Sequence, residues 1–197
     1  IRVFVLSVLL TVSLTRAGVL HVTENGAGDG STWANAASLA GALANAQEGD
    51  EIWIEQGTYE NDWDGTTSFK VSVENLSLYG GFTNGMASLS ERDWAAYPTV
   101  LSGAETRRVV TVTVSNAVLD GLSIQDGYLA AVVPATGIYK DTKGMLLLAN
   151  CVVARNRANA MAALGFSPPA LATVRQVHSS RVAIIATGDT AGVEADA

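Results

Sequence analysis

The amino-acid sequence predicts an all-β fold, a parallel β-helix (solenoid) of stacked coils that begins with a capping α-helix. Three observations lead to this expectation. An alanine-rich helical pattern ends at Gly49 and passes directly into a short β pattern at residues 51–55. Short apolar runs bounded by Gly, Asn, Asp or Ser then recur along the chain. Some apolar positions repeat at an interval of 29 residues, which is typical of solenoid proteins.

The N-terminal part of the predicted domain consists of one strand, a loop and the capping helix. Residues 19–22 have a short β pattern, and the glycine-rich residues 26–31 form a loop. Apolar residues then follow the i, i+4, i+7 spacing of one helical face. This spacing predicts a helix over residues 33–47, with Ser31 or Thr32 as its N-cap.

Coils of three short strands and three turns are expected from about residue 51. Parallel coils stacked about 4.8 Å apart satisfy the backbone hydrogen bonds of each strand with its neighbours above and below. The predicted strands are residues 52–54, 69–73, 76–79, 99–101, 109–114, 118–119 with 122–124, 145–148 with 151–153, and 174–177 with 181–184.

The intervals also predict which residues stack on neighbouring coils. Inward columns are expected to be apolar because the interior of a coil excludes water. One such column consists of Ile54, Leu78, Val100 and Ile124. It continues at the 29-residue interval with Val153 and Val182. The same interval assigns one turn position to Gly121, Asn150 and Ser179.

An antiparallel sandwich with evenly spaced strands is the alternative fold. Such a fold is expected to carry Asn-Gly or Asp-Gly hairpin turns between its strands. Asn84-Gly85 and Asp120-Gly121 are present, but the first pair lies between weak strand patterns. The sequence therefore favours the parallel coil.

Residues 1–17 have the features of a signal peptide. Arg2 supplies a positive charge, residues 3–14 are almost continuously apolar, and Thr15 and Ala17 are small residues at the two positions that a signal peptidase inspects. The apolar run is too short for a membrane-spanning helix, which needs about 20 residues. A buried core strand is the alternative interpretation. We expect an exported chain whose mature domain covers residues 18–197, with no membrane span after the signal peptide.

Charge and cysteine content narrow the possible partners. The formal net charge is −7, which disfavours nucleic acid as a partner because phosphate binding needs clustered Lys and Arg. Cys151 is the single cysteine, so no intramolecular disulfide is possible. An exported chain without disulfides is expected to depend on a large regular core.

An ordered set of short segments resembles secreted bacterial right-handed parallel β-helix proteins of the pectin-lyase-like superfold. This group includes polymorphic outer-membrane proteins and chains with a cell-surface anchor. The resemblance implies a right-handed coil, a secreted, cell-surface or outer-membrane location in a bacterium, and a chain that is the N-terminal part of a longer protein. The matching segments are residues 28–33, 47–54, 57–59, 78–82, 92–94, 98–103 and 119–124.

The later part of the chain departs from the family pattern. Residues 134–139 read PATGIY, where related coils carry a Gly-Gly-Gly-Ile-Tyr turn. Residues 161–169 fit a coil poorly, and the sequence stops at Ala197 in the middle of the pattern. We therefore expect the β-helix to be incomplete at its C-terminus.

The superfold includes polysaccharide lyases and hydrolases, so the resemblance raises the question of an active site in this chain. The resemblance implies that a lyase would hold Ca²⁺ with carboxylates on adjacent coils and use an Arg or Lys as base. At the 29-residue interval, however, Asp126 is followed by Arg155, and Asp120 is followed by Ala149. No column of acids emerges, so no catalytic residue and no metal site is predicted. Ca²⁺ is expected only if the chain is such an enzyme.

Residues 59–65 interrupt the coil pattern and suggest a ligand-binding loop. An exposed Trp63 between Asp62 and Asp64 can stack on a sugar ring while the carboxylates accept hydrogen bonds from its hydroxyl groups. Tyr59 would line the same loop. In the alternative interpretation, Trp63 folds back over the coil wall and the acids only solvate the loop.

Two functions remain open from the sequence. The first is a non-catalytic secreted or cell-surface module, an adhesin or stalk, whose side walls contact a polysaccharide or a surface protein. The alternative is a polysaccharide lyase or glycosidase that acts on acidic polysaccharide.

A local ion pair within residues 92–94, packed on Trp94, is expected to be structural.

Overall fold

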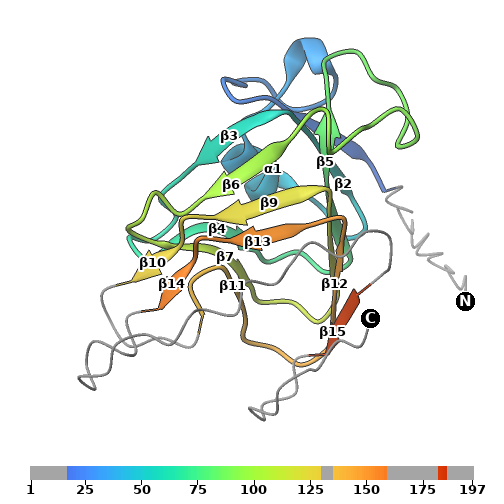
Figure 1. Ribbon diagram of the computed structural model, residues 1–197. Coiled ribbons are helices and arrows are strands. Elements are labelled where there is room, and N and C mark those ends of the chain that lie inside the picture. The colour runs from blue at the N-terminus through green and yellow to red at the C-terminus, as the bar shows by residue number, and fades with distance from the viewer. Residues whose placement is uncertain (1–16, 130–134, 159–181, 186–197) are drawn as a thin grey trace, which may run out of the picture.

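The computed structural model describes residues 17–129, 135–158 and 182–185, and its architecture is mostly β (Figure 1). The helical elements are η1 (Trp33–Asn35) and α1 (Leu39–Asn45). The strands are β1 (Val19–Val22), β2 (Glu51–Glu55), β3 (Gly57–Glu60), β4 (Thr67–Val71), β5 (Leu76–Phe82), β6 (Thr99–Ser102), β7 (Arg108–Val112), β8 (Ala117–Asp120), β9 (Leu122–Gln125), β10 (Tyr128–Leu129), β11 (Ile138–Lys140), β12 (Met145–Ala149), β13 (Val152–Ala154), β14 (Arg157–Ala158) and β15 (Val182–Ile185).

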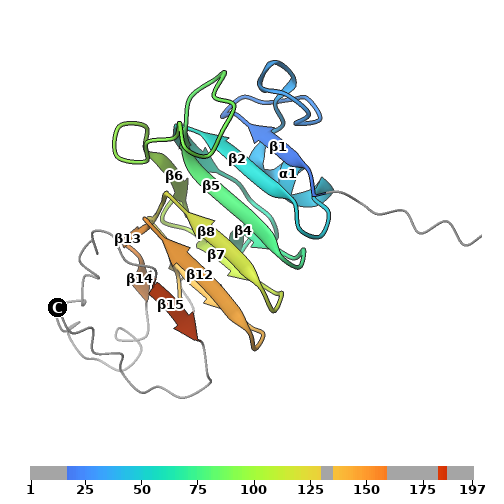
Figure 2. The ribbon, with the colours of Figure 1, turned by 90° about the vertical axis from the view of Figure 1, so that its right-hand side faces the viewer.

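Three main sheets carry the fold. Sheet A has the order β1-β2-β5-β8-β12-β15, sheet B has β3-β6-β9-β13, and sheet C has β4-β7-β11. Every pair in these sheets is parallel except β12 with β15. From β2 to β9, the chain visits sheets A, B and C in turn and then returns to sheet A (Figures 1 and 2). The prediction of an all-β fold with parallel strands is confirmed.

The strand registers align apolar residues from successive strands, and these residues belong to one core cluster. Each fully buried aliphatic side chain contributes about 1.5–3 kcal/mol to stability by leaving water. In sheet A the aligned residues are Ile52, Leu78, Leu119 and Leu148. In sheet B they are Tyr59, Leu101, Ile124 and Val153. In sheet C they are Phe69, Val110 and Ile138.

Only the later part of the predicted column is confirmed. Val153 pairs with Ile124, as the 29-residue interval predicts. The earlier part is wrong. Leu78 pairs with Ile52 rather than with Ile54 in sheet A, whereas Val100 lies in sheet B and pairs with Ser123. Residues 83–98 lengthen the connection between β5 and β6, so a constant interval does not hold across them.

The predicted turn position is confirmed for its two described members. Gly121 and Asn150 directly follow the paired residues Asp120 and Ala149. Both have left-handed backbone conformations, with φ of 72° and 50° respectively. Glycine and asparagine adopt this conformation at the lowest cost, which explains their presence here.

Val182 does not continue the parallel column. It pairs with Leu148 because β15 lies antiparallel to β12 at the edge of sheet A. An apolar strand can hydrogen-bond to a sheet edge in either direction, so the interval did not specify the partner or the orientation.

The predicted single helix over residues 33–47 is also wrong in extent. Thr32 accepts a hydrogen bond from the N–H of Asn35 and caps η1, and Ser38 accepts one from Gly41 and caps α1. Between them, the backbone of Ala37 is extended and bonds to β1 through the carbonyl of His21. This pairing stops the first helical turn and allows α1 to start afresh over the end of the core.

The α1 helix covers the core with Leu39, Ala42 and Leu43, all of which are buried. It lies next to β1 and β2 in Figure 2. Among the described residues, no helix is long and apolar enough to cross a membrane. The predicted signal peptide (apart from Ala17), residues 161–169, the strand at 174–177 and Ser179 lie outside the described residues.

Candidate functional site

The loop between β3 and β4 is closed by hydrogen bonds across its base. The Asn61 side chain donates to the carbonyl of Ser68 at 2.9 Å, and the N–H of Trp63 donates to the carbonyl of Thr67 at 2.9 Å. These two bonds close the base of residues 61–66, which we call the Trp63 loop.

Asp62 stabilises this loop from inside. Its Oδ1 accepts a hydrogen bond from the N–H of Gly65 at 2.6 Å, and its Oδ2 accepts one from Arg107 at 2.8 Å. The Gly65 bond, followed by the Arg107 interaction, lowers the pKa of Asp62 below the ordinary carboxyl value. Both oxygens of Asp62 therefore have partners within the protein.

Asp64 forms the second turn of the loop. Its Oδ1 accepts from the N–H and hydroxyl of Thr66, at 2.9 and 2.8 Å, and from the N–H of Thr67 at 2.8 Å. Burial alone would raise the pKa of Asp64, but these hydrogen bonds and the nearby Lys70 outweigh it and lower the pKa. Because these three bonds all go to Oδ1, Oδ2 is the oxygen that remains for a ligand.

Trp63 presents its ring on this rigid loop. Its side chain is 41% exposed, and the Lys70 ammonium lies 5.9 Å from the ring centroid. A cation at this distance is attracted to the ring and restrains its orientation. The expectation of an exposed tryptophan between two carboxylates thus corresponds to the observed geometry, although the carboxylates also serve the loop itself.

Tyr59 does not join the loop as expected. It lies within β3 and is only 5% exposed. Its hydroxyl donates to the carbonyl of Glu55 at 2.9 Å. Burial raises the pKa of the Tyr59 phenol, and the charges of Glu55 and Glu24 add to this effect. The short strand β3 was not predicted, so Tyr59 was assigned to the loop although its ring belongs to the core.

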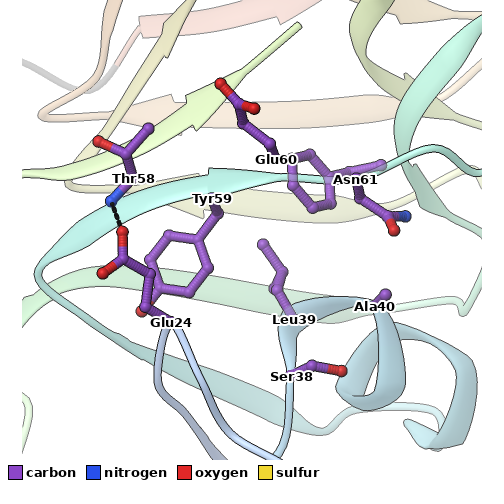
Figure 3. A pocket seen from close by; sticks show the side chains of 9 residues that line it. Glu24, Ser38, Leu39, Ala40, Thr58, Tyr59, Glu60 and Asn61 are labelled. Carbon is purple, nitrogen blue, oxygen red and sulfur yellow. Dashed lines mark hydrogen bonds between the residues drawn. The ribbon is translucent and has the colours of Figure 1, made fainter. Parts of the chain in front are cut away.

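A pocket of about 360 Å³ lies between β3 and the start of α1 (Figure 3). In Figure 3, Tyr59 and Leu39 lie near the middle of the view, and Ser38 and Ala40 extend from α1. The full lining consists of Glu24, Ser38, Leu39, Ala40, Thr58, Tyr59, Glu60, Asn61 and Phe69. The pocket adjoins the Trp63 loop, because Asn61 lines the one and begins the other.

The pocket opens along the outer edge of β3, which is the terminal strand of sheet B. At this edge the Glu24 carboxylate accepts a hydrogen bond from the N–H of Thr58 at 2.9 Å. Gly57 makes room for this contact, since a Cβ there would lie 3.2 Å from Cδ of Glu24. Glu24 is 34 residues from Thr58, so no sequence spacing indicated that it belongs to this site.

The outer face of sheet A carries an aromatic cluster. The Trp53 and Phe82 rings stack at 4.8 Å, and Trp33 lies 5.8 Å from Phe82. Trp33 also donates its indole N–H to the carbonyl of Met86 at 2.7 Å. The cluster attaches the insertion of residues 83–98 to the sheet, so Trp33 and Trp53 have structural roles.

Arg92 forms a non-local ion pair rather than the local pair expected within residues 92–94. Its guanidinium donates to Asp120 at 2.6 Å and lies 5.1 Å from the ring centroids of both Tyr79 and Trp94. The Asp93 carboxylate instead accepts hydrogen bonds from the N–H groups of Ala95 and Ala96. The contacts are structural in type, as expected.

The predicted stacking of Arg155 on Asp126 is observed. Two hydrogen bonds of 2.8 and 2.7 Å join them, and the Asp126 carboxylate raises the pKa of Arg155. Within the described part of the chain, no group of three or more His, Cys, Asp or Glu is arranged to hold a metal ion. Burial raises the pKa of the Cys151 thiol to about 11.

Comparisons with protein-family models, with curated proteins and with solved structures find no match to this chain. The Trp63 loop and the adjoining pocket are therefore the features from which a function is proposed.

Proposed function

We propose that this chain is an exported, non-catalytic carbohydrate-binding module of a bacterial surface or secreted protein, built as a right-handed parallel β-helix of the pectin-lyase-like type. The observation that carries the binding function is the exposed indole of Trp63, which a hydrogen-bonded loop holds next to two carboxylates.

The strand order supports the β-helical architecture. Sheets A, B and C receive one strand each in turn, and the registers bring residues of equivalent position into line. In such a coil the side walls are long and regular, and a loop that leaves the wall is available to a partner. The Trp63 loop leaves the coil between sheets B and C.

The loop has the properties of a stacking platform for a sugar ring. An indole offers a wide apolar face to the C–H groups of a pyranose, and it loses little conformational entropy because Trp63 is already restrained. Oδ2 of Asp64 is positioned to accept a hydrogen bond from a sugar hydroxyl. A polysaccharide with repeated units would bind more strongly through several copies of this module.

Affinity electrophoresis in gels that contain neutral or acidic polysaccharides tests the proposal. The wild type should be retarded by at least one neutral polysaccharide, and Trp63→Ala should migrate as it does in a gel without polysaccharide. Trp94→Ala is the matched control, because Trp94 is also 41% exposed but packs on Arg92. Equal retardation of wild type and Trp63→Ala, or no retardation of the wild type by any polysaccharide, would contradict the proposal.

A further inference from the structure

We infer that the pocket between β3 and α1 is a second sugar subsite, continuous with the Trp63 loop, and that the combined site selects neutral or amino-bearing sugars over uronic acids. This inference rests on the proposed function, since it assigns the ligand class and the extent of the same binding site.

The pocket has the size and lining of a small-molecule site. Ligand pockets typically enclose about 300–1,000 Å³ and combine an apolar floor with a few polar groups. Here the volume is about 360 Å³, and Leu39, Tyr59 and Phe69 supply the apolar surface. A pyranose has the same division, with an apolar face and polar edges.

Polar groups at the rim are mostly hydrogen-bond acceptors. Oε1 of Glu24 accepts a hydrogen bond from the N–H of Thr58, which leaves Oε2 for a ligand. The side-chain amide N–H₂ of Asn61 donates to the carbonyl of Ser68, so Oδ1 of Asn61 is the group that remains for a ligand. The Ser38 oxygen already accepts from the N–H of Gly41, and its own proton is free to rotate toward a ligand. Sugar hydroxyl and ammonium groups supply the donors that such a rim requires.

The backbone of β3 adds a donor on the same side. Backbone groups along a strand alternate in direction, so the N–H of Glu60 points to the same edge as that of Thr58. The N–H of Thr58 is occupied by Glu24. The N–H of Glu60 therefore faces the rim of the pocket. Asp62, two residues later, begins the turn of the Trp63 loop.

The charge of the site determines the ligand class. Two carboxylates, from Glu24 and Glu60, line the pocket, and two more, from Asp62 and Asp64, lie in the adjoining Trp63 loop. One cation, Arg107, is paired with Asp62, and another, Lys70, lies over the Trp63 ring. The Glu60 side chain points away from α1 in Figure 3 and accepts from Ser102 at 3.2 Å, but its charge remains near the strand. A chain of uronates would meet like charges at each subsite, which lowers both the rate and the strength of association.

Isothermal titration with oligosaccharides of increasing length tests the inference at low salt. The probes are cello-oligosaccharides, chitosan oligosaccharides and oligogalacturonates of two to six units. Ala40→Leu fills the pocket from the first turn of α1, and Ala44→Leu is the matched control on the same helix outside the pocket. Leucine is a good helix former, so both variants should fold.

The expected result is that a neutral or amino-bearing oligosaccharide binds, and that affinity rises with length until both subsites are filled. Ala40→Leu should lower the affinity for the longer oligosaccharides by about tenfold and abolish the gain with length, whereas Ala44→Leu should not. The double variant Glu24→Gln/Glu60→Gln should weaken the exclusion of oligogalacturonate, because it removes two negative charges from the pocket. The fold should be preserved, because each new amide keeps an oxygen that can accept from Thr58 or Ser102.

Three outcomes separate the two proposals. If Trp63→Ala abolishes binding but Ala40→Leu binds as the wild type does, the second subsite is wrong and the proposed function stands. If oligogalacturonate binds the wild type more tightly than both the cello-oligosaccharides and the chitosan oligosaccharides do, the assigned ligand class is wrong. If none of the probes and no polysaccharide binds the wild type, the proposed function fails and this inference fails with it.

Discussion

Arg92 and Asp120 form a largely buried ion pair across 28 residues of sequence, with 2.6 Å between Nη2 and Oδ2. Their side chains are only 9% and 13% exposed, respectively. Asp120 is also held by the side-chain amide of Asn150 at 2.8 Å. The pair thereby connects the insertion after β5 to the end of β8 and to the turn that follows β12.

Replacing Arg92 with Ala is expected to lower the free energy of unfolding by roughly 3 kcal/mol, because it leaves the Asp120 carboxylate buried with one fewer partner. Urea denaturation measures this change. Arg155→Ala is the control, since the Arg155 side chain is 61% exposed and its loss should leave the denaturation midpoint nearly unchanged. Equal effects of the two substitutions would show that burial does not distinguish these ion pairs.

The registers predict which apolar side chains hold the paired strands together. Ile124 is fully buried in β9, so Ile124→Ala should cost about 3 kcal/mol of stability. Val152→Ala should cost much less, because Val152 is 40% exposed in the neighbouring strand β13. Thermal or urea unfolding of the two variants checks the inward and outward assignment. A larger loss from Val152→Ala would reverse that assignment.

Gly81 is expected to be intolerant of a side chain. Its φ is 89°, and a Cβ there would lie 2.7 Å from the backbone nitrogen of Trp94. Gly85 has a similar φ of 94° but open space around it. Gly85→Ala should therefore cost only the left-handed penalty of about 1 kcal/mol, and Gly81→Ala should cost more. Comparable melting temperatures for the two variants would contradict the close approach of Trp94 to β5.

The Trp63 loop should lose its order in acid. The folded-state pKa of Asp64 is depressed below 3.8, so its contribution to stability is present above that value and is lost as the pH falls through the folded pKa. The fluorescence of Trp63 should therefore stay constant down to about pH 4 and change below it. In Asp64→Asn this acid transition should become smaller, because of the two loop carboxylates with a lowered pKa only Asp62 then remains. A midpoint above 3.8 in the wild type would mean that the hydrogen bonds to Asp64 do not stabilise its ionised form.

Cys151 should be unreactive in the folded protein. Burial raises its pKa to about 11, so little thiolate is present near neutral pH, and the sulfur donates weakly to the carbonyl of Leu119 at 3.4 Å. A thiol reagent at pH 8 should label the folded chain slowly and the urea-unfolded chain rapidly. Rapid labelling without urea would place the sulfur at the surface.

Local periodicity predicted the repeated part of the fold. Val153 pairs with Ile124, and Asn150 takes the turn position of Gly121, because the same interval of 29 residues separates the members of each pair. The spacing thus predicted the register of β13 on β9, but not that of β5 on β2, where Leu78 pairs with Ile52 and not with Ile54. Across residues 83–98 a constant interval aligns Leu78 with Val100, although the two residues belong to different sheets.

Features that depend on long-range pairing could not be predicted from spacing. The helical pattern over residues 33–47 is continuous in sequence, but pairing of Ala37 with β1 interrupts it. Strand β3 has too few apolar residues to be recognised, so Tyr59 was assigned to the loop. The contact of Glu24 with Thr58 likewise exists only because the folded chain brings the first loop over the edge of sheet B.

The candidate site was therefore predicted in part. Asp62, Trp63 and Asp64 share one loop, as adjacent residues at a turn must, and their exposure follows from the interruption of the strand pattern. The pocket beside them was missed because its lining comes from three separated segments, represented by Glu24, Leu39 and Asn61.

The most direct test of the account is to follow the indole N–H signals of the four tryptophans by NMR while a neutral oligosaccharide is added. If the ligand stacks on the Trp63 loop, the signal assigned to Trp63 by its loss in Trp63→Phe should shift. The signals of Trp33, Trp53 and Trp94 should keep their positions. Shifts confined to Trp94, or unchanged indole signals at ligand concentrations that saturate binding, would contradict the central claim.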